Sequence, residues 1–181
     1  TNGSVAMGNY STATGYSSSA IGSYSSALGD YSTATGAFSQ ANAYGASAFG
    51  AYSGASGVNS TAIGYYSTAS DANSTAVGAN SSASGVYSSA IGGYAIANGV
   101  GATAVGSYAG AVGTNATAMG YYSTATSDYS SAIGAYSTAD GAGTTAVGTY
   151  AGAAGINATA MGYYSTATGD YSSAIGAYST A

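Results

Sequence analysis

Small apolar residues recur along this chain at a fixed spacing of seven. Ala occupies all 26 positions from Ala6 to Ala181 at that spacing, and no insertion shifts the frame. Ser, Thr or Ala stands two residues before each Ala. Gly stands two residues after it at 22 of 25 positions, and Ala43, Asp71 and Ser127 are the exceptions. Each Ser-x-Ala-x-Gly unit predicts a short strand followed by a turn.

The residue between Ala and Gly shows that the full repeat consists of two such units. In alternate units this residue is large and apolar at 12 of 13 positions, and in the intervening units it is polar at 9 of 12. We therefore expect 14-residue coils with two unlike strands, stacked at about 4.8 Å per coil. The apolar row consists of Met7, Ile21, Phe49, Ile63, Val77, Ile91, Val105, Met119, Ile133, Val147, Met161 and Ile175.

The alternation of side chains along a strand decides which face each position takes. Ser4 and Ala6 share one face, while Val5 and Met7 share the other. Because only the small residues recur in both strands, we expect them to fill a thin interior and the apolar row to point outward. An exposed apolar row is an aggregation hazard for a monomer. The row is therefore predicted to be the interface of a homo-oligomer.

A period of seven is also typical of coiled coils, which need large apolar residues at two positions of each heptad in a helix-forming sequence. Here each unit carries a Gly and the background is rich in Ser and Thr, which favours strands and turns. Collagen is excluded because Gly does not recur every third residue. The expected fold class is an all-β parallel β-roll or solenoid. Residues 1–181 are predicted to form one elongated repeat domain of about 13 coils, in which residues 115–139 nearly repeat as 157–181.

Composition restricts the chemistry that this chain can perform. Its 181 residues include no Lys, Arg, His, Glu, Cys, Pro or Trp, and five Asp give a net charge of −5. Without His, Lys, Cys or Glu, no ordinary general base or activated nucleophile is present, so an enzyme is not expected. Scattered Asp predict no metal site, and no cofactor is expected. The lack of basic residues argues against nucleic-acid binding, and no segment is apolar enough to insert into a membrane.

Aromatic residues form a second regular column, at one turn of each coil. Twelve of its 13 positions are aromatic, with Phe38 and Asn80 as the two that are not Tyr. Stacked coils would bring these rings close enough for offset stacking. Two interpretations stay open. In the structural interpretation the column stiffens one edge of the solenoid and seals the oligomer interface. In the functional interpretation it is a ladder of rings that binds glycans or surfaces. The candidate ladder is Tyr10, Tyr24, Tyr52, Tyr66, Tyr94, Tyr108, Tyr122, Tyr136, Tyr150, Tyr164 and Tyr178.

Pairs of outward Thr residues form a hydroxyl-bearing face, which is a further candidate functional surface beside the apolar row and the aromatic column. Segments such as Thr12-Ala13-Thr14 project two hydroxyls, as flat ice-binding solenoids do. The array is interrupted at Gly54, Ile96, Gly110 and Gly152. A solvated β-face explains the same Thr. The five Asp are interpreted as turn residues. Glycosylation sequons begin at Asn2, Asn9, Asn59, Asn73, Asn80, Asn115 and Asn157, where the repeat itself places Ser or Thr two residues after each Asn.

Particular segments resemble a known family. Asn59-Ser60-Thr61-Ala62-Ile63-Gly64 and Ser89-Ala90-Ile91-Gly92 are similar to the head repeats of trimeric autotransporter adhesins of the YadA type. The resemblance implies a left-handed parallel β-roll, a homotrimer with the Ile/Val face turned inward, and attachment to host matrix or other surfaces. The chain departs from those heads in having almost no surface charge.

Together these observations predict an extracellular adhesin head at the cell surface, outer-membrane-anchored in a full-length adhesin. Its expected partners are other copies of itself and extracellular matrix, glycans or abiotic surfaces. A structural subunit of a pilus-like or phage fibre is the alternative, and an ice-binding solenoid is the third hypothesis.

Overall fold

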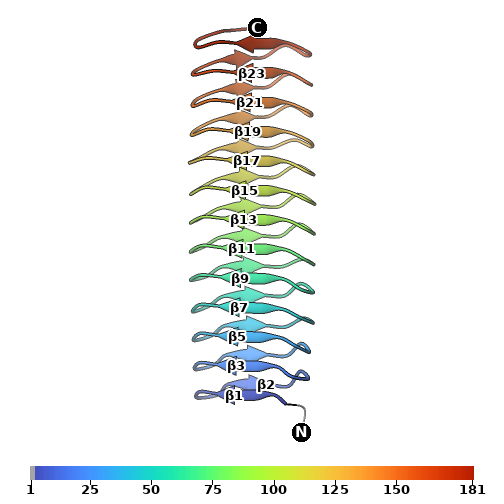
Figure 1. The fold of residues 1–181 in the computed structure, drawn as a ribbon, viewed down its shortest axis with the longest axis vertical. Coiled ribbons are helices and arrows are strands. Elements are labelled where there is room, and N and C mark those ends of the chain that lie inside the picture. The colour runs from blue at the N-terminus through green and yellow to red at the C-terminus, as the bar shows by residue number, and fades with distance from the viewer. Residues whose placement is uncertain (1–2) are drawn as a thin grey trace. The chain divides into compact units, whose positions relative to one another are not determined.

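The computed structural model describes residues 3–181, which form two compact units, residues 3–93 and 94–181. Each unit is a parallel β-solenoid with two short strands in every coil, and residues 3–181 include no helix (Figure 1). The predicted all-β solenoid with 14-residue coils is therefore confirmed. A single domain over residues 1–181, the left-handed coil and the homotrimer stay predictions. The sequon at Asn2 lies outside the described residues.

Strands of three residues alternate with strands of two. In the first unit they are β1 Val5–Met7, β2 Thr12–Ala13, β3 Ser19–Ile21, β4 Ser26–Ala27, β5 Thr33–Thr35, β6 Gln40–Ala41, β7 Ser47–Phe49, β8 Gly54–Ala55, β9 Thr61–Ile63, β10 Thr68–Ala69, β11 Thr75–Val77, β12 Ser82–Ala83 and β13 Ser89–Ile91. In the second unit they are β14 Ile96–Ala97, β15 Thr103–Val105, β16 Gly110–Ala111, β17 Thr117–Met119, β18 Thr124–Ala125, β19 Ser131–Ile133, β20 Thr138–Ala139, β21 Thr145–Val147, β22 Gly152–Ala153, β23 Thr159–Met161, β24 Thr166–Ala167 and β25 Ser173–Ile175.

Odd-numbered and even-numbered strands form separate parallel sheets in each unit. The order is β1-β3-β5-β7-β9-β11-β13 and β2-β4-β6-β8-β10-β12 in the first unit, and β15-β17-β19-β21-β23-β25 and β14-β16-β18-β20-β22-β24 in the second. Pairing is in register from one coil to the next, so that Ala62 pairs with Ala76 and Ile63 with Val77. Each position of the repeat consequently forms a column of like residues along its sheet.

The interior of each unit is made of small side chains alone. From Ala20 to Ala167 every seventh residue is an Ala that is at most 1% exposed, and the Ser, Thr or Ala two residues earlier is buried as well. The largest fully buried side chain is that of Thr144. The predicted direction of the side chains is confirmed, because Ala62 is buried while Ile63 beside it is 41% exposed.

Most buried hydroxyls are satisfied within their own turns, and those of Ser60 and Ser172 are the exceptions among residues 3–181. The Ser18 Oγ donates a hydrogen bond to the Gly15 carbonyl oxygen at 2.8 Å, and the Ser67 Oγ donates to the Gly64 carbonyl oxygen at 3.0 Å. Such a bond removes most of the penalty for burying a hydroxyl. The interior therefore accepts Ser and Thr among the alanines.

The third residue of each described turn lies in the left-handed region. In the turn after β3, the Ser25 N–H donates to the Gly22 carbonyl oxygen at 3.3 Å, and Tyr24 between them has φ 57°. A positive φ at the third residue of such a turn is typical of type II turns. In the turns that follow odd strands, the Gly itself also has a positive φ, as at Gly64 with 133°.

The three sequence positions that break the Gly column all lie in the other set of turns. Ala43, Asp71 and Ser127 follow even strands, where the first turn residue does not have a positive φ. An L side chain is therefore compatible with the backbone angle there, and every described turn after an odd strand keeps Gly.

The narrow interior predicts that Leu at Ala69 is strongly destabilising. Ala69 is fully buried, so the added carbons would overpack the site, and we expect a loss of about 1–3 kcal/mol or more in the free energy of unfolding. Leu at the exposed neighbour Thr68 should change it by less than about 0.5 kcal/mol. Circular-dichroism denaturation of both variants measures the difference. Equal stability of Ala69→Leu and Thr68→Leu would contradict the assigned side-chain directions.

The turn geometry predicts a second contrast, between two glycines. A Cβ at Gly64 would lie 2.5 Å from the Gly78 carbonyl oxygen on a residue with φ 133°, so Gly64→Ala should destabilise the protein by more than about 1 kcal/mol. Gly54 has nothing within 4 Å of such a Cβ, and Gly54→Ala should be neutral or slightly stabilising. Thermal unfolding of the two variants provides the test, which fails if Gly64→Ala melts with the parent chain.

Candidate functional site

The outward apolar row lies on the odd-strand sheet of each unit. Away from the end coils, its Ile, Phe and Met residues are 39–43% exposed, while Val77, Val105 and Val147 are half-buried. In-register pairing joins them along each unit, for example Phe49 to Ile63 and Met119 to Ile133. Met7 and Ile175, in the outermost described coils, are 62% and 72% exposed. Each unit thus presents a row of apolar side chains to solvent, and its burial by another chain stays a prediction.

The aromatic column lies at the turn after each odd strand, and its rings stack. In the first unit the ring centroids of Tyr10, Tyr24, Phe38, Tyr52 and Tyr66 follow one another at 4.7–5.1 Å, until Asn80 ends the run. In the second unit seven tyrosines follow one another at 4.6–5.8 Å with interplanar angles of 1–15°. These are Tyr94, Tyr108, Tyr122, Tyr136, Tyr150, Tyr164 and Tyr178.

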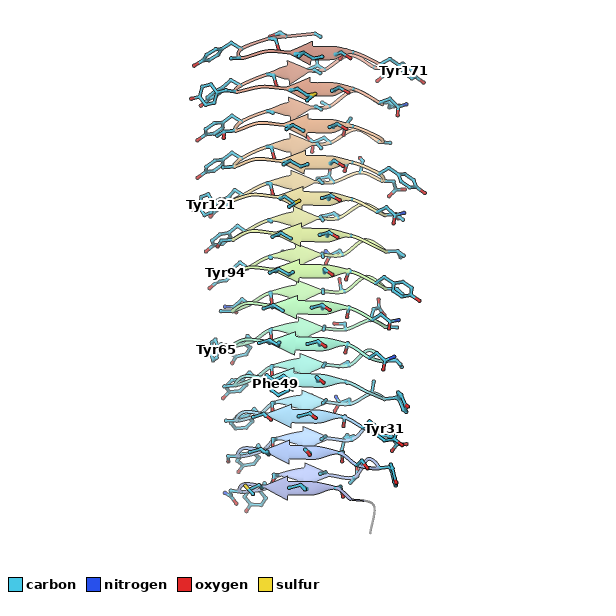
Figure 2. The ribbon with its side chains drawn as sticks, viewed as in Figure 1. Tyr31, Phe49, Tyr65, Tyr94, Tyr121 and Tyr171 are labelled. Atoms are coloured by element: carbon cyan, nitrogen blue, oxygen red, sulfur yellow. The ribbon has the colours of Figure 1, made fainter. Side chains whose placement is uncertain are left out.

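Three further tyrosines meet this column edge-on, and the sequence analysis did not include them. Tyr65, Tyr121 and Tyr163 each precede a column residue and lie at 83–89° to it, with centroids 4.5–4.6 Å apart. Figure 2 shows Tyr121 and Tyr94 at one edge of the second unit and Tyr171 at the opposite edge. The signal was the Tyr-Tyr doublet, which recurs at 65–66, 121–122 and 163–164.

Stacking determines which part of each ring meets solvent. In a parallel stack the ring faces lie against their neighbours, so the column exposes ring edges and hydroxyls. Sugars usually bind to aromatic side chains over an open ring face. The role of the ladder in binding glycans or surfaces stays a prediction, and this geometry would require it to act through ring edges and hydroxyl groups.

The column tyrosines adopt a backbone conformation that aromatic residues rarely take. From Tyr10 to Tyr178 the members of the column have φ of 52–59°. Gly and Asn are the usual residues there, because a bulky side chain makes the left-handed region unfavourable. Stacking energies of about 0.5–1.5 kcal/mol per pair can offset that strain. Tyr129 and Tyr171, in the turns after even strands, have the same φ of 58–59° without a stacked ring, so stacking adds to the stability of the column but is not required for this backbone conformation.

The turns after even strands have a more varied set of residues at the equivalent position, which includes Tyr31, Tyr87, Tyr129 and Tyr171. This column contains Asn59, Asn115 and Asn157 together with Gly45, Gly101 and Gly143, which suit a positive φ. A Cβ at Gly143 would lie 2.3 Å from the Asn157 Oδ1, so each of these Asn side chains occupies the space left by the Gly one coil earlier.

Three of the Asp residues have a structural role. The carboxylates of Asp30, Asp128 and Asp170 accept hydrogen bonds from the backbone N–H groups of Tyr16, Thr114 and Ile156 at 2.7–2.9 Å. Each donor lies one coil earlier, so the Asp caps a turn of the preceding coil.

Among residues 3–181 no group of three potential metal ligands occurs. Residues 3–181 contain no pocket. They also contain no helix that could cross a membrane.

Crowding in and beside the column raises the pKa of three phenols, those of Tyr122, Tyr136 and Tyr163, above the ordinary value of 10.0. For Tyr122 the causes are loss of water around the hydroxyl, then the neighbouring charges of Tyr121 and Tyr108. Tyr136 and Tyr163 shift in the same direction, first by loss of water. These hydroxyls therefore stay protonated to a higher pH in the folded chain.

Alkaline pH should consequently destabilise the fold. Tyrosines of the unfolded chain ionise at about pH 10, before the raised folded-state groups, so the unfolded state loses protons first. The contribution is complete below that pH and is lost as pH rises through the folded-state pKa. Thermal midpoints from about pH 8 to about pH 11 should fall, and fall less in Tyr122→Phe/Tyr136→Phe. An equal fall in both proteins would contradict this assignment.

Comparison with known proteins identifies the repeat. A sequence profile described as the YadA head domain repeat matches residues 2–25, 27–53, 55–81, 83–109, 111–137, 125–151 and 153–179. Among solved structures, the collagen-binding domain of the Yersinia adhesin YadA is similar at 23% identity and a TM-score of 0.43. That alignment covers 96% of this chain and 80% of the YadA domain. No curated protein sequence matches the chain significantly. Because the profile matches extend over nearly all of its coils, the chain belongs to the YadA head domain repeat family.

Proposed function

We propose that this chain forms the head of a trimeric adhesin on a bacterial surface, where the apolar row is buried between three chains. The observation that carries the proposal is the apolar row itself. Ile, Phe and Met side chains with 39–43% exposure in a single chain recur from coil to coil on one sheet of each unit. A monomer in water would be prone to aggregate through such a row.

Association would also supply apolar burial that the interior lacks. The interior of each unit consists of Ala, Ser and Thr, which bury little apolar area per residue. Covering the Ile, Val, Met and Phe side chains between chains would add apolar burial at every coil. In a closed cyclic assembly the apolar row of each chain packs against the same row of its neighbours, so that all chains are covered equally.

Family membership and surface chemistry favour adhesion as the task of the assembled head. The described outer surface carries hydroxyls, amides and ring edges, and the only side-chain charges in the sequence are five Asp. Polyanions would be repelled, so neutral or basic partners fit better. Because the surface repeats in every coil, many weak contacts can act together, and linked contacts raise avidity well above single-site affinity. We propose extracellular matrix as the partner class.

The proposal predicts that assembly and adhesion are lost together. Ile63→Asp/Ile133→Asp places charges on the apolar row, and a buried unpaired carboxylate strongly disfavours association. We expect the parent chain to have a discrete mass of three chains by light scattering and to bind immobilised collagen, the ligand class of the similar Yersinia domain. The double variant should have the mass of one chain and bind much more weakly.

A matched control uses apolar residues of similar exposure on the other face. Leu28 and Ile96 are 47% and 42% exposed but do not belong to the row, so Leu28→Asp/Ile96→Asp should keep both the trimer mass and the binding. A parent chain that is a stable monomer would refute the assembly. Long fibres in place of three chains would favour a fibre subunit. A trimer that binds no collagen would refute the proposed partner while leaving the assembly intact.

A further inference from the structure

The tyrosine column of the second unit is uninterrupted over seven coils. Its rings follow one another with centroids 4.6–5.8 Å apart and with nearly parallel planes, so each phenol lies directly beside the next one. Stacking alone does not require the hydroxyl, because Phe38 stacks equally well between Tyr24 and Tyr52 in the first unit. Every column position of the second unit nevertheless has a phenol.

We propose that this column is an oxidative cross-linking site, at which a one-electron oxidant such as a haem peroxidase with hydrogen peroxide joins neighbouring tyrosines as dityrosine. Each link would connect two adjacent coils of one chain covalently. Such cross-linking is independent of adhesion.

The chemistry balances with one peroxide for each link. Two phenols each lose one electron and one proton to give two phenoxyl radicals. The radicals couple through the ring carbons ortho to oxygen, one carbon–carbon bond forms, and the two ortho C–H protons are lost as the rings regain aromaticity and their hydroxyl hydrogens. In sum, two tyrosines and one hydrogen peroxide give one dityrosine and two waters, and the product is two hydrogen atoms lighter than the chain.

Two features of the chain favour this route over competing ones. Radical coupling normally requires two radicals to meet by diffusion, whereas the column keeps each phenol beside another phenol, which raises the effective concentration. The residues that most readily compete for one-electron oxidation are also missing, since the sequence has neither Cys nor Trp. The ring edges, which carry the ortho carbons, face solvent because the column residues Tyr108 to Tyr150 are 41–42% exposed.

The chain contains its own reference tyrosines. Tyr129 and Tyr171 lie in the turns after even strands and are 66% and 76% exposed, more than any column member between Tyr94 and Tyr164. Neither ring contacts another aromatic ring among residues 3–181. If exposure alone decided coupling, these two would react first; if the column decides it, they would be left out of links within the chain.

Cleavage before Asp makes the links directly readable. Cutting at Asp128, Asp140 and Asp170 yields a fragment of residues 128–139 that contains only Tyr129 and Tyr136. Its flanking fragments contain Tyr122 and Tyr150, the stacking partners of Tyr136. The dilute chain would be treated with peroxidase and peroxide, with N-acetyltyrosine in a parallel reaction to verify the oxidant, and then analysed by fluorescence and mass spectrometry.

We expect dityrosine fluorescence, an intact single-chain mass lower by pairs of hydrogen atoms, and fragment 128–139 joined to a flanking fragment. In Tyr136→Phe the ring and its stacking remain but the joined fragment should be lost, whereas Tyr129→Phe should retain it. The proposal is overturned if fragment 128–139 stays free while N-acetyltyrosine couples. It is equally overturned if the joined fragment depends on Tyr129, or if dityrosine forms only between chains.

Discussion

The narrow interior is the constraint on which the rest of the structure depends. Two sheets close on columns of Ala, Ser and Thr, and among residues 3–181 no fully buried side chain is larger than that of Thr144. Hydrophobic burial within one chain is accordingly small, and the backbone ladders, which pair each strand in register with the equivalent strand of the next coil, supply much of the order. Any large side chain must go outside, so the same constraint produces the row of Ile, Val and Met and the aromatic column.

The backbone conformation of the turns determines which residues lie at the surface beside them. Each coil must reverse within a few residues, and it does so by holding one residue per turn at a φ of 51–68°. After even strands, Asn and Gly often meet this requirement in the usual way, whereas after odd strands Tyr occupies the position at most coils and its rings stack. The aromatic column is therefore tied to the backbone path, and its rings expose edges and hydroxyls while their faces cover one another.

The fold could be predicted from sequence because its determinants are local and periodic. The invariant Ala column fixed the inward face, and the alternation of Ile63 with Ser70 and Ser56 separated the two strands of a coil. The left-handed tyrosines were not predicted, since Tyr is an uncommon residue there, although Asn115 and Gly101 at the equivalent position of the other turns were a usable signal. The role of Asp128 as a cap for Thr114 depends on which atoms face each other between coils, and only coordinates reveal that.

The central claim is that a single chain leaves its apolar row exposed and that identical chains cover it. Because the chain has no Cys, single-cysteine variants can measure this directly. Ile133 and Ile96 are 40% and 42% exposed in one chain but lie on opposite sheets. The rates of thiol alkylation in the native Ile133→Cys and Ile96→Cys proteins should therefore differ, with Ile133→Cys protected until denaturant separates the chains and Ile96→Cys labelled at once. Equal, rapid labelling at both positions would contradict the account.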